Sequence, residues 1–114
     1  MMTIDTLKAF GANTEEGLGR CMNNEAFYFR LVGMSVQDAN FARLQEAVAS
    51  HDLDAAFEAS HALKGVLGNL ALTPLFRPAS EMCELLRNRT EMDYEPLLDE
   101  LMQAKVQLDA LLAE

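Results

Sequence analysis

Hydrophobic residues recur every three or four positions along most of the chain, which is the spacing of one face of an α-helix. No segment alternates hydrophobic and polar residues convincingly enough to indicate a half-buried β-strand. The pattern therefore predicts an all-α protein. The expected helices cover residues 4–10, about 17–24, 25–34, 38–50, about 53–72, 73–89 and 94–113.

Residues that favour helix ends support several of these boundaries. Thr14 is expected to cap the second helix, with acidic residues behind it in the first turn. Asp52 or Asp54 is expected to cap the helix that runs to about Leu72. Thr73 followed by proline predicts another helix start. Pro78 conflicts with the helical pattern around it, so we expect either a kink there or a helix that settles only after it.

The lengths of the segments predict how the helices are arranged. Four longer helices span about residues 38–113, and their connections are short, which favours antiparallel neighbours. The expected fold is an antiparallel, up-down four-helix bundle. One to three shorter helices, within about residues 3–35, would cap this bundle. We expect residues 1–114 to form a single domain, which favours a free-standing protein.

Composition and charge restrict the kinds of partner. Half of the 114 residues are hydrophobic, and 18 acidic side chains outnumber 9 basic ones, for a formal net charge of −9. Such a surface repels phosphate backbones and anionic lipids, so we expect neither nucleic acid nor membrane as a partner. Cys21 and Cys83 match no metal-binding spacing and are expected to be reduced thiols. The chain shows no signal-peptide pattern, so we expect a cytoplasmic protein, with a monomer as the default.

The helix around His61 carries the candidate chemistry. At 100° per residue, the hydrophobic residues of this helix gather opposite His61, so the imidazole is expected to point into solvent. An imidazole is substantially neutral and nucleophilic near neutral pH. The residues on the opposite side of the helix are Ala59, Leu63, Val66, Leu67 and Leu70.

The neighbours of His61 on the same face are small or charged. Gly65 and Gly68 would clear side chains from around the imidazole, although glycine inside a helix costs about 1 kcal/mol relative to alanine. Lys64, three residues after His61, is expected to be exposed and to reach a negative group on the ring. Phe57 is expected either to pack against an adjacent helix or to contact a docking partner, and Glu58 is expected to be solvated on the same access surface.

This face suits phosphoryl transfer, which depends mainly on positioning and on electrostatic stabilisation of the transferred group. The sequence has no phosphate-binding loop, no kinase motif and no carboxylate cluster for magnesium. The chain would therefore carry a phosphoryl group without taking it from ATP by itself.

The segment His61-Ala62-Leu63-Lys64-Gly65, followed by Gly68, resembles the His-x-x-Lys-Gly signature of histidine-containing phosphotransfer (HPt) domains. The resemblance extends from about Glu16 to the C-terminus. It implies a phosphocarrier rather than an enzyme, with His61 as phosphoacceptor, Lys64 as the phosphate-stabilising cation and Gly65 as the residue that permits docking. The implied partners are response-regulator receiver domains and a sensor histidine kinase. No cofactor is implied on this chain, because the receiver domain would carry the magnesium ion.

Three positions depart from the family pattern. Ala71 stands where a glycine is usual, and Pro78 is unusual in the following helix. Many members have a Gln or Glu on that helix that orients the imidazole, and the matching place here is near Cys83. The ring is then oriented by the neighbouring Glu84, by water or by nothing.

Two other hypotheses compete with phosphotransfer. The chain would alternatively be a non-catalytic adaptor that binds receiver domains or other signalling proteins. A metal- or substrate-binding helical enzyme is the weaker alternative, because no second ligand has suitable spacing to His51 or His61. His51 is expected to close the preceding helix without a functional role.

Overall fold

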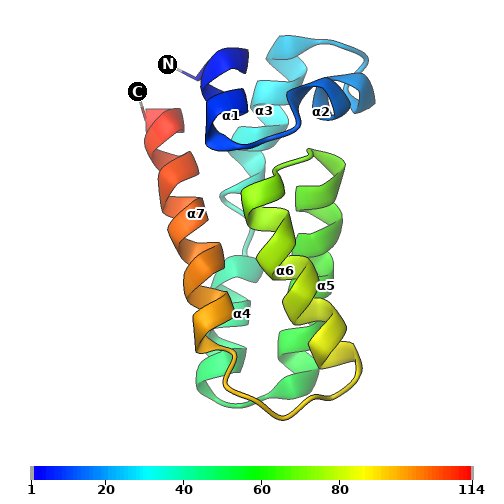
Figure 1. The fold of residues 1–114 in the computed structure, drawn as a ribbon, viewed down its shortest axis with the longest axis vertical. Helices are drawn as coiled ribbons and strands as arrows, with labels where there is room; N and C mark the ends of the chain where they lie inside the picture. The colour runs from blue at the N-terminus through cyan, green and yellow to red at the C-terminus, as the bar shows by residue number, and fades with distance from the viewer. Residues whose placement is uncertain (1, 114) are drawn as a thin grey trace.

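In the computed structural model, which describes residues 2–113, this stretch folds into seven helices and contains no strand. The expected all-α class is therefore confirmed (Figure 1). The helices are α1 (Ile4–Phe10), α2 (Thr14–Arg20), α3 (Glu25–Ser35), α4 (Asn40–Ala49), α5 (Leu53–Asn69), α6 (Thr73–Arg87) and α7 (Glu95–Ala113).

Helices α4 to α7 form the bundle, and the three N-terminal helices gather at one end of it (Figure 1). The third of these, α3, is not shorter than every bundle helix, contrary to expectation, because its 11 residues exceed the 10 of α4. Helix α5 packs against both α4 and α6, and α6 also packs against α7. The bundle therefore has α5 and α6 as neighbouring antiparallel helices, which places α6 beside the His61 helix.

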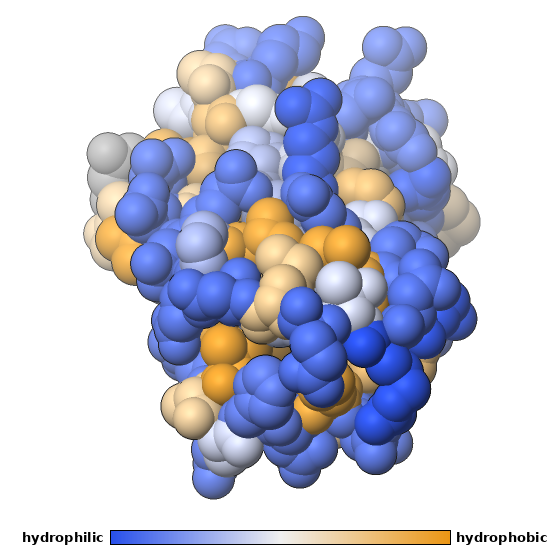
Figure 2. All heavy atoms as spheres, turned by 60° about the horizontal axis from the view of Figure 1, so that its bottom comes forward, coloured by the Kyte–Doolittle hydropathy of each residue, from blue (hydrophilic) through white to orange (hydrophobic). Residues whose placement is uncertain are grey.

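A continuous hydrophobic core joins the bundle to the N-terminal helices. Each fully buried leucine stabilises the fold by about 1.5–3 kcal/mol relative to an exposed one. Figure 2 shows that the surface around the lower end of the bundle in Figure 1 is mostly hydrophilic, with hydrophobic atoms exposed between the polar ones. The largest fully buried side chains include Leu7, Tyr28, Leu44, Leu63, Leu67, Leu75, Met82, Leu101 and Leu108.

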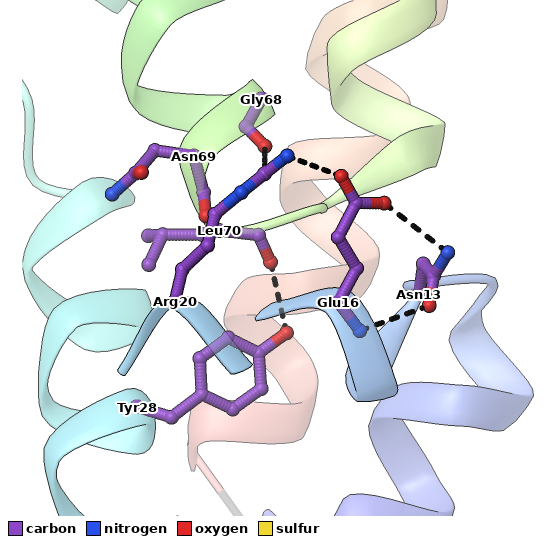
Figure 3. A network of polar contacts seen from close by, with 7 residues as sticks. All are labelled: Asn13, Glu16, Arg20, Tyr28, Gly68, Asn69 and Leu70. Atoms are coloured by element: carbon purple, nitrogen blue, oxygen red, sulfur yellow. Dashed lines mark hydrogen bonds and ion pairs between the residues drawn. The ribbon is translucent and has the colours of Figure 1, made fainter. Parts of the chain in front are cut away.

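The N-terminal helices are fastened to the C-terminal end of α5 by polar contacts (Figure 3). The Tyr28 hydroxyl donates a hydrogen bond of 2.9 Å to the Leu70 carbonyl. Arg20 donates to the carbonyls of Gly68, at 2.5 Å, and Asn69, at 3.3 Å, and it pairs with Glu16 on its own helix. These donors satisfy carbonyl groups that a helix end leaves without partners, and the cation at this end complements the helix dipole.

The buried phenol of Tyr28 is a neutral donor at ordinary pH. Burial, with a smaller contribution from the nearby Cys21, raises the pKa of Tyr28 to about 12. The hydrogen bond to the Leu70 carbonyl therefore persists across the physiological range. Cys21 and Cys83 are both buried and free, as the sequence predicted.

Several predicted boundaries differ from the observed ones by two to four residues. Asn13, rather than Thr14, caps α2, and its side chain accepts a hydrogen bond from the Glu16 amide. That helix ends at Arg20 rather than near residue 24, because Met22 and Asn23 adopt left-handed backbone conformations. Such a conformation ends a helix.

Helix α5 begins as predicted but ends earlier than expected. The Asp52 side chain caps it by accepting from the Ala55 amide at 3.1 Å. It ends at Asn69 rather than Leu72, and Ala71 then adopts a left-handed conformation with φ of 56°. This is the position at which the family resemblance expects glycine, the residue that adopts this conformation most readily.

Helix α6 passes through Pro78 without a break. The N-cap position is Leu72 rather than Thr73, the cap that the sequence predicted, and Thr73 is the first residue of the helix. Because the helix is already formed from Thr73 onward, the alternative of a helix that settles only after Pro78 is wrong. Pro78 is the sixth residue of the helix and is fully buried. Proline there removes one backbone hydrogen bond near the helix start, and burial of its ring in the core offsets part of that loss.

Within residues 2–113, no helix is both long and apolar enough to cross a membrane.

Candidate functional site

His61 lies in the middle of α5 and is exposed, as the helical wheel predicted. On the opposite side of the helix, Ala59, Leu63 and Leu67 are buried, and Leu70 is buried just beyond its end. Val66 is only half-buried. The apolar stripe of α5 therefore directs the imidazole away from the core.

The imidazole ring contacts Cys83 on α6 and Phe57 on its own helix. The Cys83 sulfur from α6 lies 3.8 Å from His61 Nδ1, which is a long contact suited to sulfur. The Phe57 ring, one turn earlier on α5, stacks on the imidazole with centroids 5.6 Å apart and planes 23° apart. Because Nδ1 faces α6, Nε2 is the ring nitrogen available to a partner.

Phe57 and Cys83 both contact Arg87. The Arg87 guanidinium lies 5.2 Å from the centre of the Phe57 ring, and one of its nitrogens lies 4.0 Å from the Cys83 sulfur. Phe57 is half-buried against this α6 side chain, so packing against an adjacent helix is the interpretation that the structure supports. Glu58 is exposed and lines a groove between α4 and α5.

Lys64 is only half-exposed, contrary to the expectation of a freely exposed side chain. Its ammonium donates a hydrogen bond of 2.9 Å to a carboxylate oxygen of Glu84 on α6, and 30% of its side-chain surface is exposed. The other Glu84 oxygen lies 3.5 Å from Arg87. The hydrogen bond and charge of Lys64, and to a smaller extent Arg87, lower the pKa of Glu84. Of the two residues considered for orienting the imidazole, Cys83 contacts the ring, whereas Glu84 pairs with Lys64 and Arg87.

The two glycines on this face differ in their surroundings. A Cβ atom at Gly65 would meet nothing within 4 Å, so Gly65 leaves open space one turn from His61. A Cβ at Gly68 would lie 2.9 Å from the Phe76 ring of α6. Gly68 therefore permits the close approach of Phe76, and with Gly65 it lines an open hollow on this side of α5.

Sequence reasoning missed two residues of this site, Arg87 and Phe76. Arg87 lies four residues after Cys83, so the helical repeat puts both on one face of α6. That repeat alone does not show which residues of α5 they meet. The relative placement of α5 and α6 was needed, and one sequence does not give it.

Among residues 2–113, no three His, Cys, Asp or Glu side chains converge in a way that would hold a metal ion. The site that does exist consists of an exposed imidazole with a lysine three residues later, in a helical bundle. This is the arrangement that the His-x-x-Lys-Gly resemblance implies for a phosphocarrier of the histidine type.

A family model described as the Hpt domain matches residues 35–114. The chain therefore belongs to the Hpt domain family. Hpt domains are phosphocarriers without kinase sites of their own, so the chain has a histidine phosphotransfer role in two-component signalling and meets partners of that system. The match begins at the last residue of α3, which leaves α1, α2 and nearly all of α3 outside it. Comparisons with curated proteins and with solved structures find no significant match.

Proposed function

We propose that His61 accepts a phosphoryl group from a receiver aspartate or a histidine kinase and passes it to the receiver aspartate of a response regulator. The observation that carries this proposal is the exposed imidazole whose Nδ1 faces Cys83 and whose Nε2 faces away from α6. Under this proposal the carrier is a cytoplasmic monomer.

The chemical step uses His61 Nε2 as the nucleophile. Its lone pair attacks phosphorus, a phosphorus–nitrogen bond forms, and the bond between phosphorus and the aspartate oxygen breaks, so the carboxylate leaves with that electron pair. In the reverse direction a receiver carboxylate attacks phosphorus and the imidazole leaves. Any magnesium ion in this step belongs to the receiver domain.

The surrounding side chains support the step by orientation and charge. Phe57 and Cys83 restrict the rotation of the imidazole, which keeps Nε2 directed outward. Lys64, three residues from His61 on the helix, supplies the positive charge for the phosphoryl oxygens. Gly65 leaves the space that a receiver domain needs to bring its aspartate to the ring.

Transfer from a receiver domain charged with acetyl phosphate tests the proposal. A labelled phosphoryl group should move from the receiver to this protein. The new bond should be labile in acid and stable in alkali, as expected for a phosphoramidate. His61→Gln should abolish labelling while circular dichroism and unfolding midpoint stay unchanged. His51→Gln is the matched control, because His51 is also exposed and should leave labelling intact.

Labelling of the His61→Gln variant would overturn the proposal. Stable binding of the charged receiver with no transferred label would instead support a non-catalytic adaptor.

A further inference from the structure

The cation expected to stabilise the phosphoryl group already has a partner in this structure. Glu84 accepts a hydrogen bond from Lys64 at 2.9 Å and lies 3.5 Å from Arg87. Cys83, the preceding residue, contacts the imidazole. One carboxylate on α6 therefore already pairs with Lys64, the cation three residues after His61 that is expected to meet the phosphoryl group.

We propose that Glu84 competes with the phosphoryl group of His61 for Lys64, and thereby lowers the stability of the phosphorylated state. This inference rests on the proposed function and assigns Glu84 a regulatory role within the same site. Glu84 touches neither the substrate nor the ring, and acts through Lys64 alone.

The charges at the site support an exchange of partners. A phosphoryl group carries about 1.5 to 2 negative charges near neutral pH, against one for a carboxylate, so it is the stronger partner for Lys64. Half of the Glu84 side-chain surface is exposed, and ion pairs at such sites contribute little to stability. Lys64 is therefore free to exchange partners at small cost.

Arg87 gives the released carboxylate a second partner. When Lys64 turns to the phosphoryl group, Glu84 remains beside Arg87, which already lies 3.5 Å away. The competition for Lys64 therefore favours release of the phosphoryl group to a receiver, which a carrier in a relay requires.

The test compares two neutral substitutions on the same helix. The protein is equilibrated with a receiver domain charged with acetyl phosphate, and the ratio of phosphorylated to free protein is measured by intact mass. Glu84→Gln should raise this ratio roughly two- to fivefold, the equivalent of one partly exposed ion pair. Glu81→Gln, an exposed glutamate that forms no ion pair within residues 2–113, makes the same change in net charge and should leave the ratio unchanged.

A second comparison shows whether Glu84 acts through Lys64. In a Lys64→Ala background, Glu84→Gln should change the ratio much less than it does in the unsubstituted protein. NMR titration of the Glu84 carboxyl should also show its pKa rising when His61 is phosphorylated, because Lys64, the main cause of its lowered pKa, has moved away.

The outcomes separate this inference from the proposed function. Equal ratios for Glu84→Gln and Glu81→Gln, or an undiminished effect in the Lys64→Ala background, overturn the role of Glu84 alone. A complete absence of phosphohistidine in the unsubstituted protein overturns the proposed function and this role with it.

Discussion

Helix α5 is held in two different ways along its length. At its C-terminal end, the buried Tyr28 and the guanidinium of Arg20 donate hydrogen bonds to backbone carbonyls (Figure 3). In its middle, His61 makes a long contact with the Cys83 sulfur of α6, and Lys64 forms a partly exposed ion pair with Glu84.

Because of this difference, we expect substitutions in the two regions to affect different properties: the free energy of unfolding in one and phosphoryl transfer in the other. At the C-terminal end, the Tyr28 hydrogen bond is buried and Gly17 packs closely against Tyr28, so changes at these two residues should alter the free energy of unfolding. Around His61, the sulfur contact is long and the Lys64 ion pair is partly exposed, so changes to His61 or Lys64 should alter phosphoryl transfer with little effect on folding. A histidine can remain exposed on this helix because α5 is fixed by its buried stripe and by its far end.

The largest expected effect on stability is at Gly17. A Cβ atom at this position would lie 2.6 Å from the Tyr28 ring and hydroxyl, and 2.7 Å from the Leu70 carbonyl. Gly17→Ala should therefore lower the free energy of unfolding by about 1–3 kcal/mol, measured by urea denaturation. Gly19→Ala is the control, because a Cβ there meets nothing within 4 Å. A Gly17→Ala variant as stable as Gly19→Ala would contradict the close packing of α2 on α5.

The next largest expected effect on stability is the loss of one hydrogen bond at Tyr28. Tyr28→Phe removes the donor at 2.9 Å from the Leu70 carbonyl, so the free energy of unfolding should fall by about 1–2 kcal/mol. The rate of phosphoryl transfer by the folded protein should stay the same, because His61 lies more than two helical turns away. Tyr94→Phe is the comparison, since its hydroxyl bonds only the local Thr90 carbonyl. A drop in transfer rate as large as the drop in stability would show that the two regions are coupled.

The sequence predicted the region around His61 better than the far end of α5. The exposure of His61 follows from helical periodicity alone, because the apolar stripe of a single helix fixes which side faces out. The all-α class follows from the same periodicity. The contacts of Tyr28 and Arg20 with Leu70 and Gly68 join residues more than forty positions apart, and no local pattern contains that information.

The same distinction explains what the sequence did not show within the site. Gly65 and Gly68 look alike on a helical wheel, yet only Gly68 lies against Phe76 of the next helix. The partner of Lys64 likewise comes from α6, twenty residues later. Properties of one helix were predictable from the sequence, whereas properties that depend on how α5 and α6 face each other were not.

Alanine substitutions at Gly65 and Gly68 should have smaller effects on the free energy of unfolding, and they compare two glycines on the same face of α5. Gly65→Ala should raise the free energy of unfolding by about 0.5–1 kcal/mol, because alanine favours the helix and its Cβ meets nothing. Gly68→Ala should gain less or lose stability, because its Cβ would lie 2.9 Å from the Phe76 ring. Urea denaturation of both variants measures the difference.

A bulkier side chain at Gly65 should affect the docking of a receiver domain without lowering the stability of the fold. Gly65→Leu should keep the helix at least as stable but block transfer from a charged receiver, because the side chain fills the approach to His61. An unchanged transfer rate in this variant would refute the role of Gly65 in access.

The smallest effect on stability is expected at Lys64, together with a clear effect on chemistry. Its pair with Glu84 is partly exposed, so Lys64→Ala should change the free energy of unfolding by less than about 0.5 kcal/mol. Transfer to His61 should slow by roughly tenfold, since the phosphoryl group loses a charge-assisted contact. Lys8→Ala, an exposed change on α1, is the control for both measurements. If Lys64→Ala destabilised the fold while transfer per folded molecule stayed constant, Lys64 would be a structural residue, and the contrast between the two regions of α5 would not hold.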